Sequence, residues 1–128
     1  MLRTAMVFAL IVVSAPALAG DPEAGAKVFK KCQACHAVGE GAQNKVGPEL
    51  NGIFGRPAGS VPDYAYSDAN KNSGIVWDHE IFAEYIKNPR GYIKGTKMSF
   101  AGLKKDKEIE DVTAYLDQFN ADGTMKSE

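Results

Sequence analysis

The chain has 128 residues, of which 45% are hydrophobic and 24% are charged, and its formal net charge is −1. This length suits one domain with a limited apolar core. The near-neutral charge balance argues against a nucleic-acid-binding protein, which would carry an excess of basic residues. Internal repeats, low-complexity tracts and linkers are absent from the sequence.

Residues 1–19 have the pattern of a secretory signal peptide. Arg3 gives a positive start, residues 5–13 form an apolar run, and residues 17–19 are a small-residue cleavage pattern. The alternative is a retained membrane anchor, but this apolar run is short for a bilayer span of ~20 residues. We therefore expect cleavage after Ala19 and a single domain over residues 20–128.

The first predicted helix begins at Asp21 and Pro22 and runs to about Cys35. Asp21 is a good N-cap acceptor, and proline is well suited to the first helical position because its missing N–H costs nothing there. Val28 and Phe29 form the apolar face of this helix.

Near the end of this helix stands Cys32-Gln33-Ala34-Cys35-His36, a CxxCH motif. Two thiols at this spacing can bond to one edge of a porphyrin, and the following histidine can bind its iron, so the motif predicts attachment of c-type haem. A thioredoxin-like dithiol would need a βαβ pattern, which is missing. A zinc site would need four ligands, and a disulfide would leave His36 unexplained.

Turns and three further helices are predicted downstream. Residues 39–63 are rich in Gly, Pro and Asn, which indicates turns wrapped around an internal partner. A short helix is expected from about Asp68 to Asn72, with Ser67 as its cap. The next helix begins after Asp78 and ends at Pro89, because proline stops a helix. Its apolar residues recur at helical spacing, at positions 81, 82, 85 and 86.

Residues 91–102 are predicted to form another loop, and the last helix runs from about Lys107 to Asn120. The apolar stripe of that helix comprises Ile109, Val112, Leu116 and Phe119. Alternating strand patterns are missing, so the sequence predicts an all-α domain.

Met98 is the strongest candidate for a second iron ligand. A thioether is a soft, neutral ligand that favours ferrous iron. Met1 and Met6 leave with the signal peptide, and Met125 lies in a polar tail. The alternative role for Met98 is gap-filling in a core, but it stands in a loop without amphipathic period. His79 is the rival ligand, although its position in a polar helix start favours a solvated side chain.

Beyond these motifs, the chain resembles the class I cytochromes c, particularly the bacterial cytochromes c2 and their mitochondrial relatives. The resemblance is colinear over the whole of residues 20–128, and the CxxCH motif is near the N-terminus, unlike in the four-helix class II cytochromes. The matching segments are GPELNGIFGR (47–56), YSDANKN (66–72), GIVW (74–77), EYIKNP (84–89), GTKMSFAG (95–102) and AYL (114–116).

The resemblance implies a role for each matching residue. His36 and Met98 would be the axial ligands of the haem iron. The other cofactor-binding positions would be Cys32, Cys35, Pro48, Arg56, Tyr66, Asn70, Trp77, Tyr85 and Thr96. Pro48 would support His36 through its carbonyl group, Arg56, Tyr66 and Trp77 would surround the propionates, and Asn70, Tyr85 and Thr96 would form a polar network near Met98.

The terminal helices would meet through Gly25, Phe29 and Tyr115. Two positions depart from the family pattern, because Arg90 stands where many relatives have lysine and Lys94 where many have proline.

The resemblance also implies a class I cytochrome c fold, with helices and long loops around one covalently attached haem c. The expected protein is a soluble, monomeric, periplasmic one-electron carrier between membrane redox complexes. Its donor would be a bc1-type complex and its acceptor an oxidase or a photosynthetic reaction centre. A peroxidase-like haem enzyme and an anchored electron-entry domain of an oxidase complex are the alternatives.

Charge placement predicts a docking face. Residues 87–105 hold six basic residues and no acidic one, whereas residues 106–128 hold seven acids and two lysines. The basic stretch brackets Met98, so we expect redox partners with acidic surfaces. The predicted docking patch comprises Lys31, Lys45, Arg90, Lys97, Lys104 and Lys105.

Overall fold

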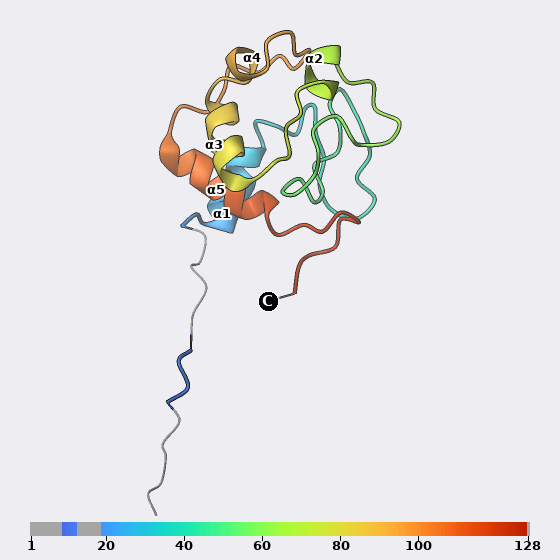
Figure 1. Cartoon of the computed structure of the whole chain (residues 1–128). Helices are drawn as coiled ribbons and strands as arrows, with labels where there is room; N and C mark the ends of the chain where they lie inside the picture. The colour runs from blue at the N-terminus through green and yellow to red at the C-terminus, as the bar shows by residue number, and fades with distance from the viewer. Residues whose placement is uncertain (1–8, 13–18, 128) are drawn as a thin grey trace, which may run out of the picture.

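The computed structural model describes residues 9–12 and 19–127 of the chain. This part contains α1 (Pro22–Phe29), α2 (Asp68–Lys71), α3 (His79–Lys87), α4 (Pro89–Tyr92) and α5 (Asp106–Leu116). Its only β structure is two isolated bridges, so the predicted all-α class is confirmed (Figure 1). The predicted signal peptide falls outside the described residues, apart from residues 9–12 and Ala19. Among the described helices, none is long and apolar enough to span a membrane.

The predicted starts of α1, α2 and α3 are confirmed by side-chain caps, whereas α5 starts without one. The Asp21 carboxylate accepts a hydrogen bond from the Glu23 N–H, the Ser67 hydroxyl from the Asn70 N–H, and the Asp78 carboxylate from the Ile81 N–H. Each cap satisfies one of the N–H groups that lack a partner at the start of a helix.

The ends of the helices differ from the predictions. α1 ends at Phe29 and not near Cys35, because the chain tightens into turns in which the Cys32 N–H bonds the Phe29 carbonyl (2.7 Å). α5 ends at Leu116 and not at Asn120, because the next residues form similar turns, in which an N–H bonds the carbonyl three residues earlier. Helix periodicity continues through such turns, so the sequence pattern does not distinguish them from α-helix.

α4 was not predicted, and it spans the predicted end of α3 at Pro89 and the first two residues of the predicted loop 91–102. Pro89 ends α3 as expected, yet it also opens α4, because proline at the first helical position has no N–H to leave unpaired. The Asn88 side chain caps this short helix by accepting a bond from the Gly91 N–H (3.1 Å).

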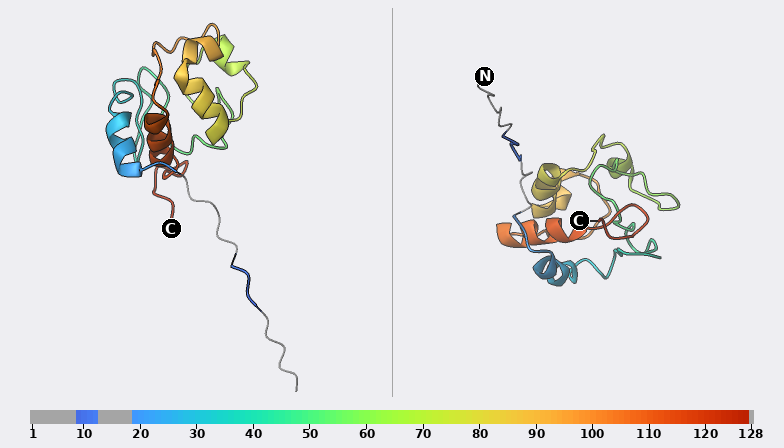
Figure 2. Two further views of the ribbon diagram at one scale, coloured as in Figure 1. Left: turned by 90° about the vertical axis from the view of Figure 1, so that its left-hand side faces the viewer. Right: turned by 90° about the horizontal axis from the view of Figure 1, so that it is seen from below.

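The predicted contact between the terminal helices is confirmed. α1 and α5 lie side by side in both views of Figure 2. A Cβ atom added to Gly25 would lie 1.9 Å from the backbone oxygen of Asp111, so only glycine allows this approach. The Phe29 and Tyr115 rings pack at 5.4 Å between centroids. This pair of helices forms one side of the molecule, and loops 38–66 and 93–105 make up much of the rest (Figure 1).

Candidate functional site

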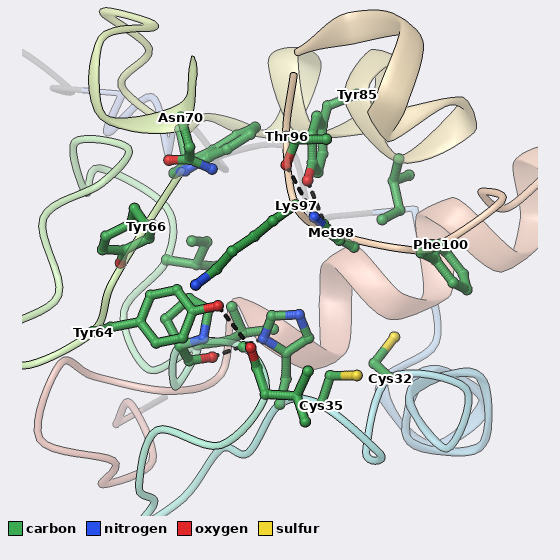
Figure 3. Close-up of a pocket in the computed structure, with 18 of the residues that line it drawn as sticks. Cys32, Cys35, Tyr64, Tyr66, Asn70, Tyr85, Thr96, Lys97, Met98 and Phe100 are labelled. Carbon is green, nitrogen blue, oxygen red and sulfur yellow. Dashed lines mark hydrogen bonds between the residues drawn. The ribbon is translucent and has the colours of Figure 1, made fainter. Parts of the chain in front are cut away.

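A cavity of about 370 Å³ lies among α1, α3, α5 and the two long loops (Figure 3). It is lined by every residue that the sequence assigned to cofactor binding or iron ligation. These are Cys32, Cys35, His36, Pro48, Arg56, Tyr66, Asn70, Trp77, Tyr85, Thr96 and Met98. Cys32 and Met98, which are 66 positions apart in the chain, thus line the same cavity.

His36 is held in a fixed orientation on one wall of the cavity. Its Nδ1 lies 2.7 Å from the carbonyl oxygen of Pro48. Because that oxygen only accepts, Nδ1 carries the proton and Nε2 keeps its free lone pair for a metal. Burial lowers the pKa of His36, which favours this neutral form.

Gly47 provides the space in which the His36 ring sits. A Cβ atom at this position would lie 2.4 Å from Cε1 of His36 and under 3 Å from both ring nitrogens. Any other residue would therefore push the imidazole out of position. The cradle explains why glycine precedes Pro48 in the segment that supports the histidine.

The two thiols line the same cavity as His36, and Figure 3 shows Cys32 and Cys35 at one side of it. Both are free and partly buried. Burial raises the pKa of Cys32 to about 11, so its thiol is protonated at neutral pH.

Met98 lies at another wall of the cavity, in the loop that follows α4. The Tyr85 hydroxyl, from α3, donates to Met98 Sδ at 2.9 Å. The Met98 N–H donates to the Thr96 hydroxyl at 3.3 Å. Burial raises the pKa of Tyr85 to about 12, so this hydroxyl keeps its proton at neutral pH. The sulfur is thus positioned by one side chain from a helix and one from its own loop.

Arg56 and Trp77 are brought together by a short antiparallel pairing of two loops. The Trp77 N–H bonds the Arg56 carbonyl (3.1 Å), next to the bridge between Pro57 and Val76. The Arg56 guanidinium donates to the carbonyl groups of Asn51 and Glu49, both at 3.1 Å. It also lies 3.5 Å from the Glu49 carboxylate, so its charge already has a partner.

Asn70 and Tyr66 leave hydrogen-bonding capacity open. Among the described residues, Asn70 Oδ1 is the one buried side-chain oxygen or nitrogen without a hydrogen-bond partner. Tyr66 accepts from the Val61 N–H (3.0 Å), and its own O–H remains available as a donor. Unpaired polar groups inside a cavity point to a missing polar partner.

These observations fit a haem group. The cavity joins paired thiols, a histidine nitrogen with a free lone pair and a thioether sulfur, the donor set of a covalently attached six-coordinate haem. Gly47 leaves room for the His36 ring in the cavity wall. The unpaired Asn70 oxygen can accept a hydrogen bond from a polar group inside the cavity.

Sequence reasoning missed Tyr64, which also lines the cavity. Its hydroxyl donates to the Val46 carbonyl (2.6 Å). A signal for it was present, since Tyr64 and Tyr66 are two residues apart and therefore share one face of an extended segment. Their rings pack edge to face at 4.8 Å.

The residues of the predicted docking patch differ in how they are held. Lys31 and Lys97 line the cavity, and the other four do not. Lys31 pairs with Glu108 at 2.9 Å. Four of the other cations donate to oxygen atoms. Lys45 donates to the Gln33 carbonyl, Arg90 to the Ser99 hydroxyl, Lys97 to the Ala65 carbonyl, and Lys104 to the carbonyls of Lys87 and Ala101. Lys105 is exposed at the start of α5.

The rival ligands lie elsewhere. His79 is not among the cavity residues, and its Nε2 lies 3.1 Å from the Asp117 carboxylate while its ring packs against Phe54. Met125 is 55% exposed in the C-terminal segment. In the part of the chain that the structure describes, no three His, Cys, Asp or Glu side chains gather as a metal site.

The comparisons with known proteins agree with this geometry. The family model for cytochrome c matches residues 22–120. The chain is 55% identical to cytochrome c2 of Blastochloris viridis over 124 residues, which cover 94% of this chain and 98% of that protein. It is 61% identical to cytochrome c2 of Rhodoplanes tepidamans (83% and 99% covered). Cytochrome c-550 of Nitrobacter winogradskyi is 56% identical (84% and 99%).

Among solved structures, cytochrome cH from Methylobacterium extorquens superposes with a TM-score of 0.72 at 41% sequence identity. The match covers 77% of this chain and 98% of that structure. The chain therefore belongs to the cytochrome c family, whose members carry one covalently attached haem c and act as electron-transfer proteins rather than enzymes.

Proposed function

We propose that this protein is a soluble periplasmic electron carrier whose haem c is attached through Cys32 and Cys35 and ligated by His36 and Met98. The observation that carries the ligand assignment is the bond from His36 Nδ1 to the Pro48 carbonyl, which leaves Nε2 as a metal-binding atom in the cavity that Met98 also lines. When bound, the haem supplies a one-electron couple.

The remaining cavity residues would hold and tune the cofactor. Pro48 fixes the histidine tautomer, and Tyr85 and Thr96 position the methionine sulfur. Arg56, Tyr66 and Trp77 would surround the propionates, with Arg56 as a fixed cation that Glu49 partly balances. Asn70 would contribute its unpaired oxygen to the polar network near Met98.

Two side chains that could act on a substrate are already engaged, which favours a carrier over a peroxidase-like enzyme. An enzyme needs an open iron position and a distal acid–base group. Tyr85 donates its proton to Met98, and its pKa of about 12 places it outside acid–base work at neutral pH. His36 is the one histidine that lines the cavity, and it is committed to Pro48.

The proposed location and partners rest on sequence features and on charge. The pattern of residues 1–19 supports export, with residues 20–128 as the working domain. The basic stretch 87–105 favours partners with acidic docking surfaces. We propose membrane redox complexes as these partners, with a bc1-type donor and an oxidase or photosynthetic reaction centre as acceptor.

Sequencing the first residues of the purified protein separates the exported carrier, which begins at Gly20, from an anchored domain, which retains its leader.

The ligand assignment is tested by spectroscopy of the purified holoprotein. The ferric protein should show a methionine-to-iron charge-transfer band and strongly shifted methionine methyl resonances. Met98→Ala should abolish both, whereas Met125→Ala, a matched change at an exposed methionine, should keep them. Unchanged spectra in Met98→Ala would refute the assignment.

A further inference from the structure

Tyr64 and Lys97 connect the loops that flank the cavity. We propose that they act as positioning residues, forming a Tyr64–Lys97 clasp that holds the Met98 loop closed beside the segment supporting His36. The inference rests on the proposed function in that it takes Met98 as the iron ligand. The contacts that define the clasp are made by the chain's own residues (Figure 3).

Tyr64 forms the first half of the clasp and is bonded to the segment that supports His36. The Tyr64 hydroxyl donates to the Val46 carbonyl at 2.6 Å. Val46 is followed by Gly47 and Pro48, the two residues that cradle and bond the His36 ring. Tyr64 is therefore bonded to the same short segment that orients the proximal histidine.

The turn before Tyr64 is itself restrained. Asp63 has a φ of 62°, a left-handed conformation that is uncommon for a residue with a side chain. The side-chain amide of Asn44 donates to the Pro62 carbonyl at 3.0 Å and so ties the turn to the loop before Val46. A turn held in this way fixes the direction in which the Tyr64 ring projects.

The second half of the clasp comes from residues 93–99, the loop that carries Met98 (the methionine loop). The Lys97 ammonium lies 4.4 Å from the centroid of the Tyr64 ring, within the range of a cation–π contact. It also donates to the carbonyl oxygen of Ala65. Lys97 directly precedes Met98, so these contacts fix the backbone beside the sulfur that would bind iron.

The methionine loop has few other restraints. Lys94, Gly95, Lys97 and Ser99 are exposed. Apart from the clasp, its side-chain bonds are the one from the Tyr85 hydroxyl to Met98 Sδ, the one from the Met98 N–H to Thr96 and an exposed one from Arg90 to Ser99. A segment with few buried contacts opens at low cost. Opening this loop must separate Lys97 from Tyr64, so the clasp adds directly to the free energy of opening.

The experiment measures how fast an external ligand displaces Met98. Imidazole is added to the ferric holoprotein, and loss of the methionine-to-iron band is followed for Tyr64→Phe, which removes the hydroxyl and keeps the ring, and for Lys97→Gln. The matched controls are Tyr115→Phe, a tyrosine outside the cavity lining, and Lys105→Gln, which removes the same charge from the same basic stretch.

We expect Tyr64→Phe and Lys97→Gln each to raise the rate of imidazole binding about fivefold, the size of one hydrogen bond, while both controls stay near wild type. Tyr64→Leu, which also removes the ring, is measured alone and combined with Lys97→Gln. The combination should accelerate binding by less than the product of the Tyr64→Leu and Lys97→Gln effects, because the two side chains share one contact. Rates in both clasp variants equal to those in the controls would overturn the proposal.

A second readout does not depend on the iron ligand. Hydrogen exchange of the reduced holoprotein should speed up in both residues 44–47 and residues 95–98 when Tyr64 is changed, because the clasp joins them. If the wild-type protein lacks the methionine band, the ligand assignment fails while this exchange result still judges the clasp. Exchange that rises in only one of the two segments would show that they are not coupled through Tyr64.

Discussion

The Tyr85 hydroxyl oxygen lies 2.9 Å from Met98 Sδ and donates its proton to the sulfur. A hydrogen bond to a ligand atom withdraws electron density that the atom would otherwise give to the metal. A thioether that donates less stabilises ferrous iron relative to ferric iron and raises the reduction potential. Tyr85 is therefore a tuning residue in the proposed ligand set, in addition to its place in the core.

Tyr85→Phe should lower the potential of the holoprotein by about 20–60 mV, the equivalent of one hydrogen bond in a one-electron couple. The change removes one oxygen and keeps the ring that packs against Trp77 at 4.8 Å. A redox titration followed by optical spectra measures the shift. Tyr115→Phe should leave the potential at its wild-type value, and a potential that is equal in both variants would exclude the tuning role.

Gly47→Ala should prevent His36 from taking its observed position. The new Cβ would lie 2.4 Å from the ring, closer than any unstrained contact. We expect a loss of more than about 2 kcal/mol in the free energy of unfolding, as for other overpacked sites, together with a low yield of holoprotein. Denaturant unfolding and the haem-to-protein ratio measure the two effects.

The control for Gly47→Ala is Gly41→Ala. Gly41 has a φ of 75° and open space around its Cα, so alanine there meets only backbone strain of about 1 kcal/mol. The variant should load haem normally. Equal yields of holoprotein from the two variants would show that the Gly47 cradle does not position His36.

Much of this site could be predicted because its residues stand in short motifs. Cys32, Cys35 and His36 share five residues, and Met98 was singled out by its soft sulfur in a loop without helical period. The same local signals located the caps at Asp21, Ser67 and Asp78. Local chemistry therefore carried the element starts and the positions of the thiols, the histidine and the thioether, whereas the other cavity residues were predicted from the resemblance to the class I cytochromes c.

What could not be predicted depends on contacts between distant segments. The bonds from Tyr64 to Val46 and from Lys97 to Ala65 join residues 18 and 32 positions apart, and periodicity gives no information on them. The premature end of α1 and the short α4 were missed because three-residue turns and a proline-led turn follow the same patterns as helices and loops. Glu49 was overlooked because its role exists only beside Arg56.

Asp111 should make the stability of the protein fall at acid pH. Its carboxylate accepts bonds from the Asp21 N–H (2.8 Å) and the Lys107 ammonium (2.6 Å), and these lower its pKa below the ordinary value of 3.8. A lowered pKa in the folded protein contributes stability that is present above 3.8 and is lost as the pH falls below it. The junction of α1 and α5 should loosen at that point.

Urea unfolding of wild type and Asp111→Asn, from neutral pH to below 3.8, tests this linkage. The wild-type free energy of unfolding should fall more steeply than that of the variant, because only the wild type has this carboxylate to protonate. His36 also titrates on unfolding, but it is present in both proteins, so the difference between the two curves isolates Asp111. Parallel curves would contradict the prediction.

Lys105 gives the clearest test of the docking patch. Lys97 and Lys104 are bonded to backbone oxygens, and Lys31 is paired with Glu108, so reversing those charges would also disturb local structure. Lys105 is exposed, and its side chain makes none of the hydrogen bonds or ion pairs found in the described residues. Its reversal should change the surface charge alone.

Lys105→Glu should slow electron transfer to a partner with an acidic docking surface by about three- to tenfold at low salt, through the encounter step. The difference should shrink as salt reduces the screening length to ~8 Å near physiological ionic strength. Lys126→Glu is the control in the acidic C-terminal segment, where the exposed pair of Lys126 with Asp117 (3.4 Å) contributes little to stability. Stopped-flow rates over a range of salt concentrations measure both variants. Equal slowing by both, or rates that do not depend on salt, would place the docking face elsewhere on the molecule.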